Sequence, residues 1–476
     1  MSVVNSNIAS LMFHYFEEIS QIPRGSGNEK GIADHLVRFA EERGLFCYRD
    51  EANNVFIKKA ATKGREGDPA VLLQGHTDMV CEKLPSSKHD FLTDPLQLYV
   101  EDGWLKAKGT TLGADDGVAV AAMMAILDGA IASHPALECL FTTSEETGMD
   151  GAIAFDFSLV SARSLLNLDS ADESLVVCGC AGGVRSEICL EGKRDGADGK
   201  MLAVSVSGLC GGHSGEDIHL GLANANRLVA RLLLAISAKT DMRIAAINGG
   251  SKDNAIPRDC TAVIAVKDAD LVFDIVQQEG KNIADELADA DRGFSCSVQV
   301  HDEMPSFDAC FTARLLAAIS NAPCGVIEMS RDADGLVEWS SNLGVITTEE
   351  DRVSLTFQSR STIEARLDHT ERVIEALARA CGGVAKHHGR YSGWNYEKVS
   401  PLRDRYLSAY RDLFGGEAKP VIIHAGLECG LIRAKVPDMD MISIGPENIG
   451  LHSPSERLNI ASAERFWQLL EKMLSH

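Results

Sequence analysis

Apolar residues recur along the chain in two patterns, one with helical spacing and one of short continuous runs, and the two alternate. Helical spacing predicts helices over residues 29–43 and 117–131. Short apolar runs predict buried strands over 69–75, 137–143 and 164–168. Alternation of buried strands with helices is typical of a sheet covered by helices. The first part of the chain is therefore predicted to be an α/β domain.

The pattern changes after about residue 185. A glycine-rich turn at residues 211–215 precedes a predicted helix over 219–237, and strand-like and helical stretches continue to about residue 390. No internal repeat and no low-complexity linker is evident. This change of pattern predicts an inserted second domain.

The first pattern returns near the C-terminus, with predicted strands near 420–424 and 440–445 and an amphipathic helix over 461–474. A chain of 476 residues is too long for one core of ordinary size, so two or more domains are expected. We therefore expect a discontinuous first domain that encloses the second. The predicted bounds are 1–185 with 395–476 for the first domain and 186–394 for the second.

Composition and charge restrict the partners of the protein. With 45% apolar and 24% charged residues, the chain can bury substantial cores and does not resemble a disordered protein. Lys and Arg total 46 against 69 Asp and Glu, which gives a net charge of −23. Such a charge disfavours nucleic acid and an anionic membrane surface as partners. A small molecule or a peptide fits better as a substrate.

The cysteines and the N-terminus indicate a cytoplasmic protein. The 13 cysteines are scattered, apart from Cys178 and Cys180, and match neither a disulfide scaffold nor a structural zinc site, so reduced thiols are expected. No basic region precedes a long apolar stretch at the N-terminus, and Leu11, Phe13 and Phe16 instead suggest an amphipathic helix. No apolar run approaches the length of a membrane span.

Candidate chemistry begins where the predicted strands end. His76 and Asp78 follow one apolar run and can project to the same side of an extended chain. One of them could bind a metal while the other orients it through a hydrogen bond to the imidazole. The triplet His76-Thr77-Asp78 alone is weak evidence for a metal site, since a histidine in a surface loop could have the same neighbours.

Two acidic pairs allow both a structural and a metal-binding interpretation. Asp115 and Asp116 precede an apolar helix, where an aspartate often caps the N-terminus, although bridging two cations also needs a carboxylate with both oxygens free. Glu145 and Glu146 follow a predicted strand, and neighbouring like charges are costly unless a cation compensates them. This second pair either extends into water or meets a metal.

The candidate ligands together are stronger evidence for a metal site than any one of them alone. Asp169 ends a further apolar run, and His452 supplies an imidazole far along the chain. Two imidazoles and three carboxylates are enough for two cations that share one bridging group. Nitrogen and oxygen donors of this kind suit zinc, with Mn²⁺ or Co²⁺ as substitutes. The proposed ligands are His76, Asp115, Glu146, Asp169 and His452.

These motifs carry a resemblance to a known family. The chain resembles the aminoacyl-histidine dipeptidases, also called Xaa-His or cytosol non-specific dipeptidases. They form a branch of the di-zinc peptidases that include glutamate carboxypeptidases and acetylornithine deacetylases. Eight ordered motifs, which together are more specific than any one, span nearly the whole chain. They are LLQGHTDMVCEK, TLGADDG, TSEETGMDGA, NLDS, GGHSGEDI, NAIPR, HAGLECGL and LHSP.

The resemblance implies an α/β catalytic domain with a mixed central sheet flanked by helices, and an inserted α+β domain that acts as lid and dimerisation surface. It also implies two Zn²⁺ per subunit. His76, Asp115 and Asp169 would hold one zinc ion. Asp115 would bridge to the second zinc ion, which Glu146 and His452 would complete.

The resemblance also assigns the catalytic roles. Glu145 would be the general base that takes a proton from a zinc-bound water, and Asp78 would orient His76. One position departs from the branch, which usually has Asn where this chain has Asp116. Since the wider family uses Asp there, we expect altered charge beside the metals rather than lost metal binding.

For substrate binding the resemblance points to the inserted domain and the returning segment. His213 would stabilise the oxyanion or contact the substrate, and in many relatives it is delivered across a dimer interface. Asn254 and Arg360 are candidates for gripping the free carboxylate of a dipeptide, Arg360 through its bidentate fork. His424 and Glu428, in the returning segment of the first domain, would line the site, although a packing role is equally open for both. A homodimer through the inserted domain is expected.

The function implied is metal-dependent hydrolysis of unblocked dipeptides, Xaa-His dipeptides among them. Two alternatives would use the same zinc site, namely an N-acyl amino acid deacylase and a tripeptidase. A third alternative is a catalytically silent binding protein. Retention of every proposed ligand together with Glu145 argues against this last alternative.

Overall fold

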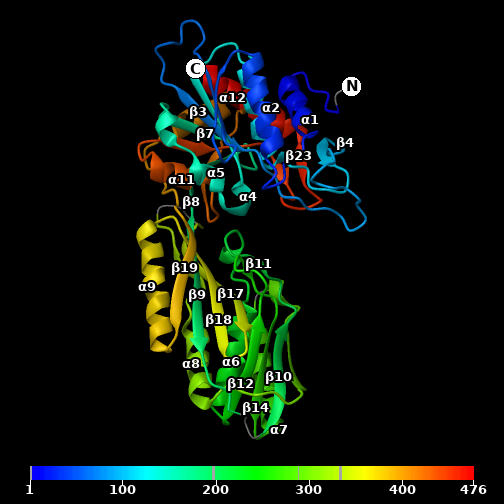
Figure 1. The fold of residues 1–476 in the computed structure, drawn as a ribbon, viewed down its shortest axis with the longest axis vertical. Coiled ribbons are helices and arrows are strands. Elements are labelled where there is room, and N and C mark those ends of the chain that lie inside the picture. The colour runs from blue at the N-terminus through cyan, green and yellow to red at the C-terminus, as the bar shows by residue number, and fades with distance from the viewer. Residues whose placement is uncertain (1–2, 196–198, 288, 332–334, 476) are drawn as a thin grey trace. The chain divides into compact units, whose positions relative to one another are not determined.

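The computed structural model describes residues 3–195, 199–287, 289–331 and 335–475 and divides the chain into two compact units (Figure 1). The second unit starts at Cys180 and ends at Gly393, a few residues before the bounds expected from the sequence. It also includes the short stretch Ile423–Gly426 of the returning chain, and the first unit contains the remainder.

The first unit contains a mixed sheet of eight strands. These are β1 (Phe46–Arg49), β2 (Val55–Lys59), β3 (Val71–His76), β6 (Leu137–Thr142), β7 (Ser164–Asn167), β8 (Leu175–Cys180), β20 (Lys419–Ile423) and β21 (Asp440–Ser443). Their order is β1-β2-β6-β3-β7-β21-β8-β20. In the middle of the sheet β3 is parallel to both β6 and β7, so the carboxyl ends of these three strands meet at one edge. This edge carries the candidate site.

Helices and a second, smaller sheet complete the first unit. The helices are α1 (Ser10–Ile19), α2 (Lys30–Glu42), α3 (Ala114–Leu127), α4 (Glu145–Gly148), α5 (Asp150–Ala154), α10 (Pro401–Phe414), α11 (Glu428–Lys435) and α12 (Ile460–Ser475). The small sheet consists of β4 (Leu98–Glu101), β5 (Trp104–Ala107), β22 (Asn448–Ile449) and β23 (Arg457–Asn459). β22 and β23 form a hairpin whose loop presents His452.

The helix α3 lies in the core of the first unit and differs in extent from the helix expected over residues 117–131. It ends at Leu127 because Gly129 adopts a left-handed backbone conformation with φ of 97°, and the Gly129 amide turns back to the carbonyl of Ile126. At its start, the backbone angles of Asp115 and Asp116 are not helical. The acidic pair therefore forms the entry to the helix.

Within its described residues, the second unit contains a sheet of nine strands covered by four helices. The strands are β9 (Gly182–Glu191), β10 (Lys200–Ser207), β12 (Met242–Gly249), β14 (Cys260–Val266), β15 (Ser295–Val300), β16 (Gly325–Met329), β17 (Val337–Thr348), β18 (Arg352–Ser361) and β19 (Val384–Tyr391). The helices are α6 (Ala225–Ser237), α7 (Ala269–Glu286), α8 (Ala309–Asn321) and α9 (Glu364–Ala380). α6 begins later than the expected residue 219 because Asn224 caps its first turn.

This large sheet is built from one topology used twice. The strand order is β15-β10-β14-β12-β17-β18-β9-β19, with β16 beside β17. The segment β10-α6-β12-β14-α7-β15 and the set β9-α8-β17-β18-α9-β19 share the same βαββαβ connectivity. The two halves join where β12 pairs with β17. The sequence shows no repeat here because the topology depends on where buried and exposed positions alternate, and many residues satisfy that alternation.

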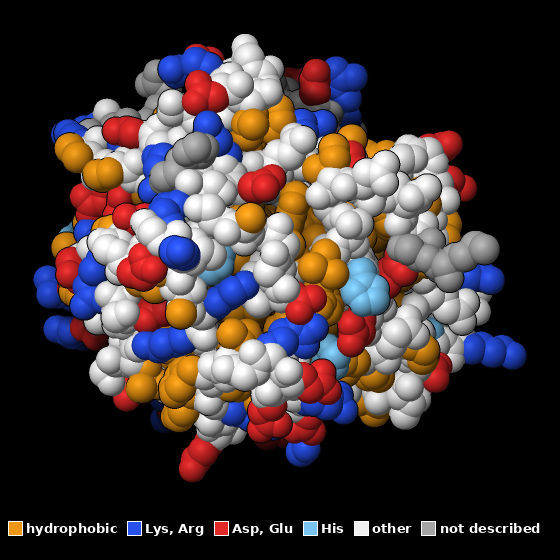
Figure 2. Space-filling model, turned by 90° about the horizontal axis from the view of Figure 1, so that it is seen from above, with side chains coloured by type: hydrophobic (Ala, Val, Ile, Leu, Met, Phe, Trp, Pro, Cys, Tyr) orange, Lys and Arg blue, Asp and Glu red, His pale blue; other side chains and the backbone are white. Residues whose placement is uncertain are grey.

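Three further observations bear on the expectations from composition. The cysteines are free thiols. Among the described residues, no helix combines the length and the apolar character that crossing a membrane requires. On the face drawn in Figure 2, acidic and basic side chains are interspersed, so the negative charge of the chain does not gather there into one patch.

Candidate metal centre

The carboxylate of Asp115 lies between two imidazoles. Its Oδ1 is 3.2 Å from His76 Nε2, and its Oδ2 is 3.2 Å from His452 Nε2. The two histidines come from the end of β3 and from the β22–β23 hairpin loop. A carboxylate whose two oxygens face separate nitrogen donors has the arrangement that a bridge between two cations requires.

Two more carboxylates complete the arrangement that the sequence predicts. Glu146 Oε2 lies 3.1 Å from His452 Nε2, and Asp169 Oδ1 lies 3.8 Å from His76 Nε2. The ligand atoms of Asp115, Glu146 and His452 all lie within 4.8 Å of one another. The structure therefore brings together all five residues that the sequence proposes as metal ligands, within one unit.

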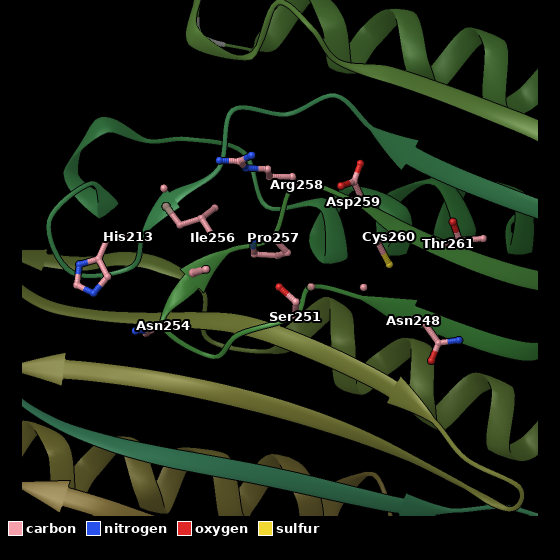
Figure 3. A pocket seen from close by; sticks show the side chains of 14 residues that line it. His213, Asn248, Ser251, Asn254, Ile256, Pro257, Arg258, Asp259, Cys260 and Thr261 are labelled. Atoms are coloured by element: carbon pink, nitrogen blue, oxygen red, sulfur yellow. The ribbon is translucent and has the colours of Figure 1, made fainter. Parts of the chain in front are cut away.

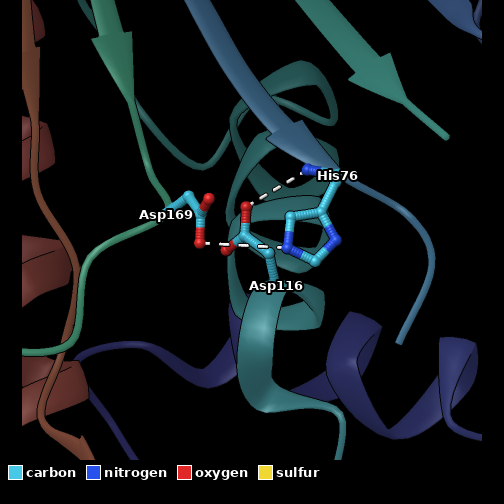
Figure 4. Close-up of side chains that lie close together, drawn as sticks. All are labelled: His76, Asp116 and Asp169. Carbon is cyan, nitrogen blue, oxygen red and sulfur yellow. Dashed lines mark hydrogen bonds and ion pairs between the residues drawn. The ribbon is translucent and has the colours of Figure 1, made fainter. Parts of the chain in front are cut away.

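Asp116 is also close enough to bind a metal. Its ligand atom lies within 4.8 Å of those of His76 and Asp169, and Figure 4 shows the ring of His76 facing both carboxylates. Asp116 Oδ2 accepts a hydrogen bond from the His76 backbone amide at 3.2 Å. Burial and the nearby charge of Asp115 raise the pKa of Asp116 well above its usual value. Crowded carboxylates of this kind favour a cation.

Asp78 supports His76 from the opposite side of the ring. Its Oδ1 lies 3.4 Å from His76 Nδ1 and accepts a hydrogen bond from the Glu145 backbone amide at 3.1 Å. Its Oδ2 accepts from Ser26 Oγ at 2.8 Å. Burial opposes the charged form of Asp78, but the contact with His76 outweighs it and lowers the pKa of Asp78 to about 2. A carboxylate in this position fixes the tautomer and the orientation of a metal-binding histidine.

Glu145 carries a carboxyl group suited to proton transfer. Burial raises its pKa to about 8; the positive charge of His76 opposes this shift, and the charges of Glu428 and Glu146 add to it. A general base works best when its pKa lies near the operating pH. The place after a strand points to the pair Glu145 and Glu146, and the resemblance assigns the role of base to Glu145. The raised pKa depends on burial, which the sequence does not show.

The backbone around the site is strained. Ser144, Met149 and His452 have φ angles of 54°, 60° and 58°, in the left-handed region that non-glycine residues rarely adopt. Ser144 and Met149 flank α4, which carries Glu146, and His452 lies within the β22–β23 loop. Glu146 and His452 therefore lie in or beside strained backbone.

A buried polar network lies under the strand ends. Glu428 Oε2 accepts hydrogen bonds from Gln74 Nε2 at 2.5 Å and from Thr142 Oγ1 at 2.7 Å, and Asn167 Nδ2 donates to Gln74 Oε1 at 2.7 Å. Burial raises the pKa of Glu428 to about 7. Gln74 and Thr142 are polar positions in otherwise apolar strands, which is the signal that could have identified the network. Sequence reasoning also missed Arg24 and Glu456, which contact the turn that carries Asp115.

The candidate substrate-binding residues lie in the second unit. β11 (Gly212–His213) pairs with β13 (Ala255–Ile256), and the Ser214 amide donates to the Asn254 carbonyl at 2.8 Å. His213 and Asn254 line a cavity of about 860 Å³ and lie toward the same end of it (Figure 3). The small strand pair therefore holds two of the four candidates next to each other.

The other two candidates meet His213 at Gly215. A Cβ atom at Gly215 would lie 2.6 Å from the His424 carbonyl oxygen, 3.1 Å from His213 Cε1 and 3.2 Å from Arg360 Nε. His424 thus packs within the second unit and not, as expected from the sequence, with the returning segment of the first domain. The reason is local, since its Nε2 lies 2.7 Å from Ser340 Oγ on β17. Burial and the charge of Arg360 lower the pKa of His424 to about 3, so the ring stays neutral.

Comparisons with known proteins place the chain among the peptidases. It is 37% identical over 468 residues to the cytosol non-specific dipeptidase of Escherichia coli (strain K12). The aligned region covers 97% of this chain and 96% of that relative. It superposes on the crystal structure of aminoacylhistidine dipeptidase from Vibrio alginolyticus with a TM-score of 0.90 and 36% identity, over 100% and 99% of the two chains. The chain belongs to the aminoacyl-histidine dipeptidase branch of the M20 metallopeptidases. The resemblance and the fold inferred from the sequence are therefore confirmed.

A solved structure of much lower sequence identity shares the fold. The aminopeptidase PepT from Bacillus cereus aligns over 98% of each chain with a TM-score of 0.56 but only 15% identity, which shows the fold alone. The family model of the peptidase dimerisation domain matches residues 204–293. That match falls on the first half of the duplicated sheet, between β10 and β15. In this chain the β12 edge of the matched segment meets β17, where Gly249 pairs with Ile346.

Proposed function

We propose that this protein is a metal-dependent dipeptidase that hydrolyses unblocked dipeptides, Xaa-His dipeptides among them. The observation that carries the proposal is the Asp115 carboxylate, whose two oxygens face His76 and His452, together with the raised pKa of Glu145 beside it. Relatives at 36% and 37% identity over nearly the whole chain are named as dipeptidases, which supports the same reaction class.

The residues present fit a pair of divalent cations. Two imidazoles and several carboxylates suit Zn²⁺, with Mn²⁺ or Co²⁺ as substitutes. Glu146 Oε1 is buried and has no hydrogen-bond partner among the described residues, so a donor atom is free for a cation. Burial together with neighbouring carboxylates also raises the pKa of Asp169. Asp115 would bridge the pair, with His76 and Asp169 on one side and Glu146 and His452 on the other.

Each catalytic side chain then has a definite task. When bound, the two cations would polarise the scissile carbonyl and lower the pKa of the attacking water. Glu145 would take a proton from that water and return it to the leaving amine, and burial raises the pKa of its carboxyl toward the range in which one group can do both. Asp78 keeps the His76 ring in one orientation throughout.

Four residues of the second unit are proposed to bind the substrate. Arg360 Nε is buried without a hydrogen-bond partner among the described residues, while Arg360 Nη1 donates to Tyr391 Oη at 2.7 Å. An arginine with unused donors is suited to the free carboxylate of a dipeptide. Asn254 would support the same carboxylate, and His213 with the neutral His424 would contact the reacting carbonyl.

We also propose a cytoplasmic homodimer that assembles through the second unit. The dimerisation-domain match within that unit and the cytosolic name of the E. coli relative support this. β12 pairs with β17 of the same chain at Gly249, so at least this end of β12 is not free for a contact between subunits.

A panel of substrates tests the proposed function. Several Xaa-His and Xaa-Gly dipeptides, one tripeptide and one N-acetyl amino acid would be incubated with zinc-loaded, chelated and Glu145→Gln protein. Cleavage of dipeptides only, abolished by chelation and by the substitution, is the expected result. Cleavage of only the acetylated compound would identify a deacylase, and cleavage of only the tripeptide would identify a tripeptidase. No cleavage by the loaded protein would favour a binding protein.

A further inference from the structure

The carboxylate of Glu456 is surrounded by the backbone amides of the turn that carries Asp115. It is 3% exposed and accepts four consecutive amide hydrogen bonds, two on each oxygen. Asn448 Nδ2 donates a fifth, at 3.2 Å. The amide distances are 2.7 Å from Leu112, 2.9 Å from Gly113, 2.9 Å from Ala114 and 3.3 Å from Asp115.

Arg24 holds the same turn through a carbonyl. Arg24 is 1% exposed, and its Nη2 donates to the carbonyl of Gly113. Its Nη1 donates to the carbonyls of Thr77 at 3.0 Å and Asp78 at 3.3 Å. One buried cation thus ties the turn that carries Asp115 to the segment of Thr77 and Asp78 that directly follows His76.

Two glycines make room for this arginine. Gly113 has a φ of 65°, and a Cβ there would lie 2.7 Å from Arg24 Nη2. A Cβ at Gly117 would lie 2.4 Å from the same nitrogen. The glycines on either side of the acidic pair are therefore needed for the approach of Arg24, in addition to any role in the turn itself.

The two side chains act on opposite ends of the peptide dipoles in this turn. An anion that accepts hydrogen bonds from successive amides is strongly stabilised at a helix N-terminus, and a cation is stabilised by carbonyl oxygens. Glu456 lies only four residues beyond His452, so one segment supplies both an imidazole and the anchor of the carboxylate that this imidazole faces. Neither side chain is within the proposed set of metal ligands.

We propose that Glu456 and Arg24 are positioning residues that fix the Asp115 carboxylate between the two cation sites. This inference rests on the proposed function, because it assigns a role within the same metal centre. Groups that orient metal ligands change metal affinity by about 10–100-fold when they are replaced. Removing either contact should therefore weaken metal binding even where the fold is retained.

The test compares two equally buried glutamates of the first unit. Glu138 is also 3% exposed and accepts hydrogen bonds from the amides of Ser161 at 3.0 Å and Ala162 at 3.1 Å. It lies near the start of β6, whereas the metal centre lies at the other end of that strand. Glutamine in place of either glutamate keeps the size, but it turns one acceptor oxygen into a donor. Glu138→Gln is therefore the matched control for Glu456→Gln.

The measurement is binding of Co²⁺ by competition with a chelator, together with the visible absorption spectrum of the bound ion. Glu456→Gln is expected to raise the Kd of Co²⁺ by about 10–100-fold and to alter the spectrum. Glu138→Gln is expected to leave both unchanged. Glu456→Asp keeps the charge on a shorter side chain, so partial recovery of affinity is expected and a second variant is available if the glutamine variant does not fold. Arg24→Lys should also raise the Kd of Co²⁺, because lysine has one nitrogen to donate to the three carbonyls that Arg24 contacts.

Two outcomes would overturn the inference alone. One is a Glu456→Gln variant that keeps the wild-type affinity for Co²⁺ and the wild-type spectrum. The other is an equal loss of Co²⁺ affinity in Glu138→Gln, which would mean that replacing any buried glutamate weakens metal binding as much. Failure of the wild-type protein to bind Co²⁺ would overturn the proposed metal centre as well. The dipeptide panel reports separately on the reaction, so the two proposals can fail independently.

Discussion

Asp78 Oδ1 accepts a hydrogen bond from the backbone amide of Glu145 at 3.1 Å. The same oxygen lies 3.4 Å from His76 Nδ1, so one carboxylate connects the end of β3 with the turn that presents the proposed general base. The orientation of a proposed metal ligand and the position of the base therefore depend on one side chain. Substitutions at these positions should separate metal binding from proton transfer.

Replacement of Asp78 by asparagine is expected to reduce both metal affinity and kcat. The amide can still accept one hydrogen bond, but it loses the charge that holds the His76 ring, and the loss of a group of this kind costs about 10–100-fold. Metal content after dialysis and steady-state kinetics on a dipeptide would measure the two effects. Unchanged metal affinity in Asp78→Asn would contradict the assigned role.

The neighbours Glu145 and Glu146 are expected to differ sharply. Glu145→Gln should lower kcat by about 10²–10⁴-fold with two metal ions retained, because it removes only a proton acceptor. Glu146→Gln should lose metal at the site shared with His452, since it removes a proposed ligand. Metal analysis of each variant, together with its activity, checks this contrast. Loss of metal from Glu145→Gln would show that Glu145 is a ligand.

Asp116→Asn tests whether Asp116 binds a metal. An asparagine oxygen can still accept the hydrogen bond from the His76 amide, so we expect two bound metals. Activity should fall by no more than the roughly 10–100-fold that is typical of changes at groups that surround metal ligands. The geometry also allows Asp116 to bind a metal together with His76 and Asp169. A metal count of one in the asparagine variant would establish that role and reject our expectation.

Much of the candidate site could be predicted because its residues follow elements with strong patterns. β3, β6 and β7 are buried on both faces and read as continuous apolar runs, so their bounds are predicted within two residues. Polar residues directly after such runs are conspicuous. Parallel neighbours then bring His76 and Thr142 to the same edge of the sheet.

The rest could not be predicted because it depends on contacts between distant segments. Glu456 meets the Leu112 amide across 344 positions of sequence, and a lone glutamate or arginine carries no pattern that marks such a contact. The sequence predicts His424 in the first domain, but the chain crosses back into the second unit for the four residues Ile423–Gly426, and no pattern marks so short a crossing. The duplicated topology likewise leaves no repeat of residue identities.

Glu138 provides a prediction on pH and stability. Burial would raise its pKa, but hydrogen bonds from Ser161 and Ala162 and the contact with Lys58 lower it below the usual value. The charged form therefore stabilises the fold above the unfolded-state pKa of about 4.3, and this contribution is lost as the pH falls from there through the folded-state pKa.

Wild-type protein should exceed Glu138→Gln in unfolding free energy by about 1–3 kcal/mol at pH 7, and by less as the pH falls below about 4.3. Urea denaturation of both metal-free proteins at pH 7 and near pH 4 would measure the difference. A difference that does not change with pH would show that the charge of Glu138 contributes nothing.

The most direct test of the central claim is to return metal to chelated protein in steps and to follow dipeptide hydrolysis against the number of equivalents bound. The account predicts no activity without metal, and activity that reaches its plateau at two equivalents of Zn²⁺ per chain. Full hydrolysis by the chelated protein, or a plateau at one equivalent, would contradict a reaction that depends on two cations bridged by Asp115.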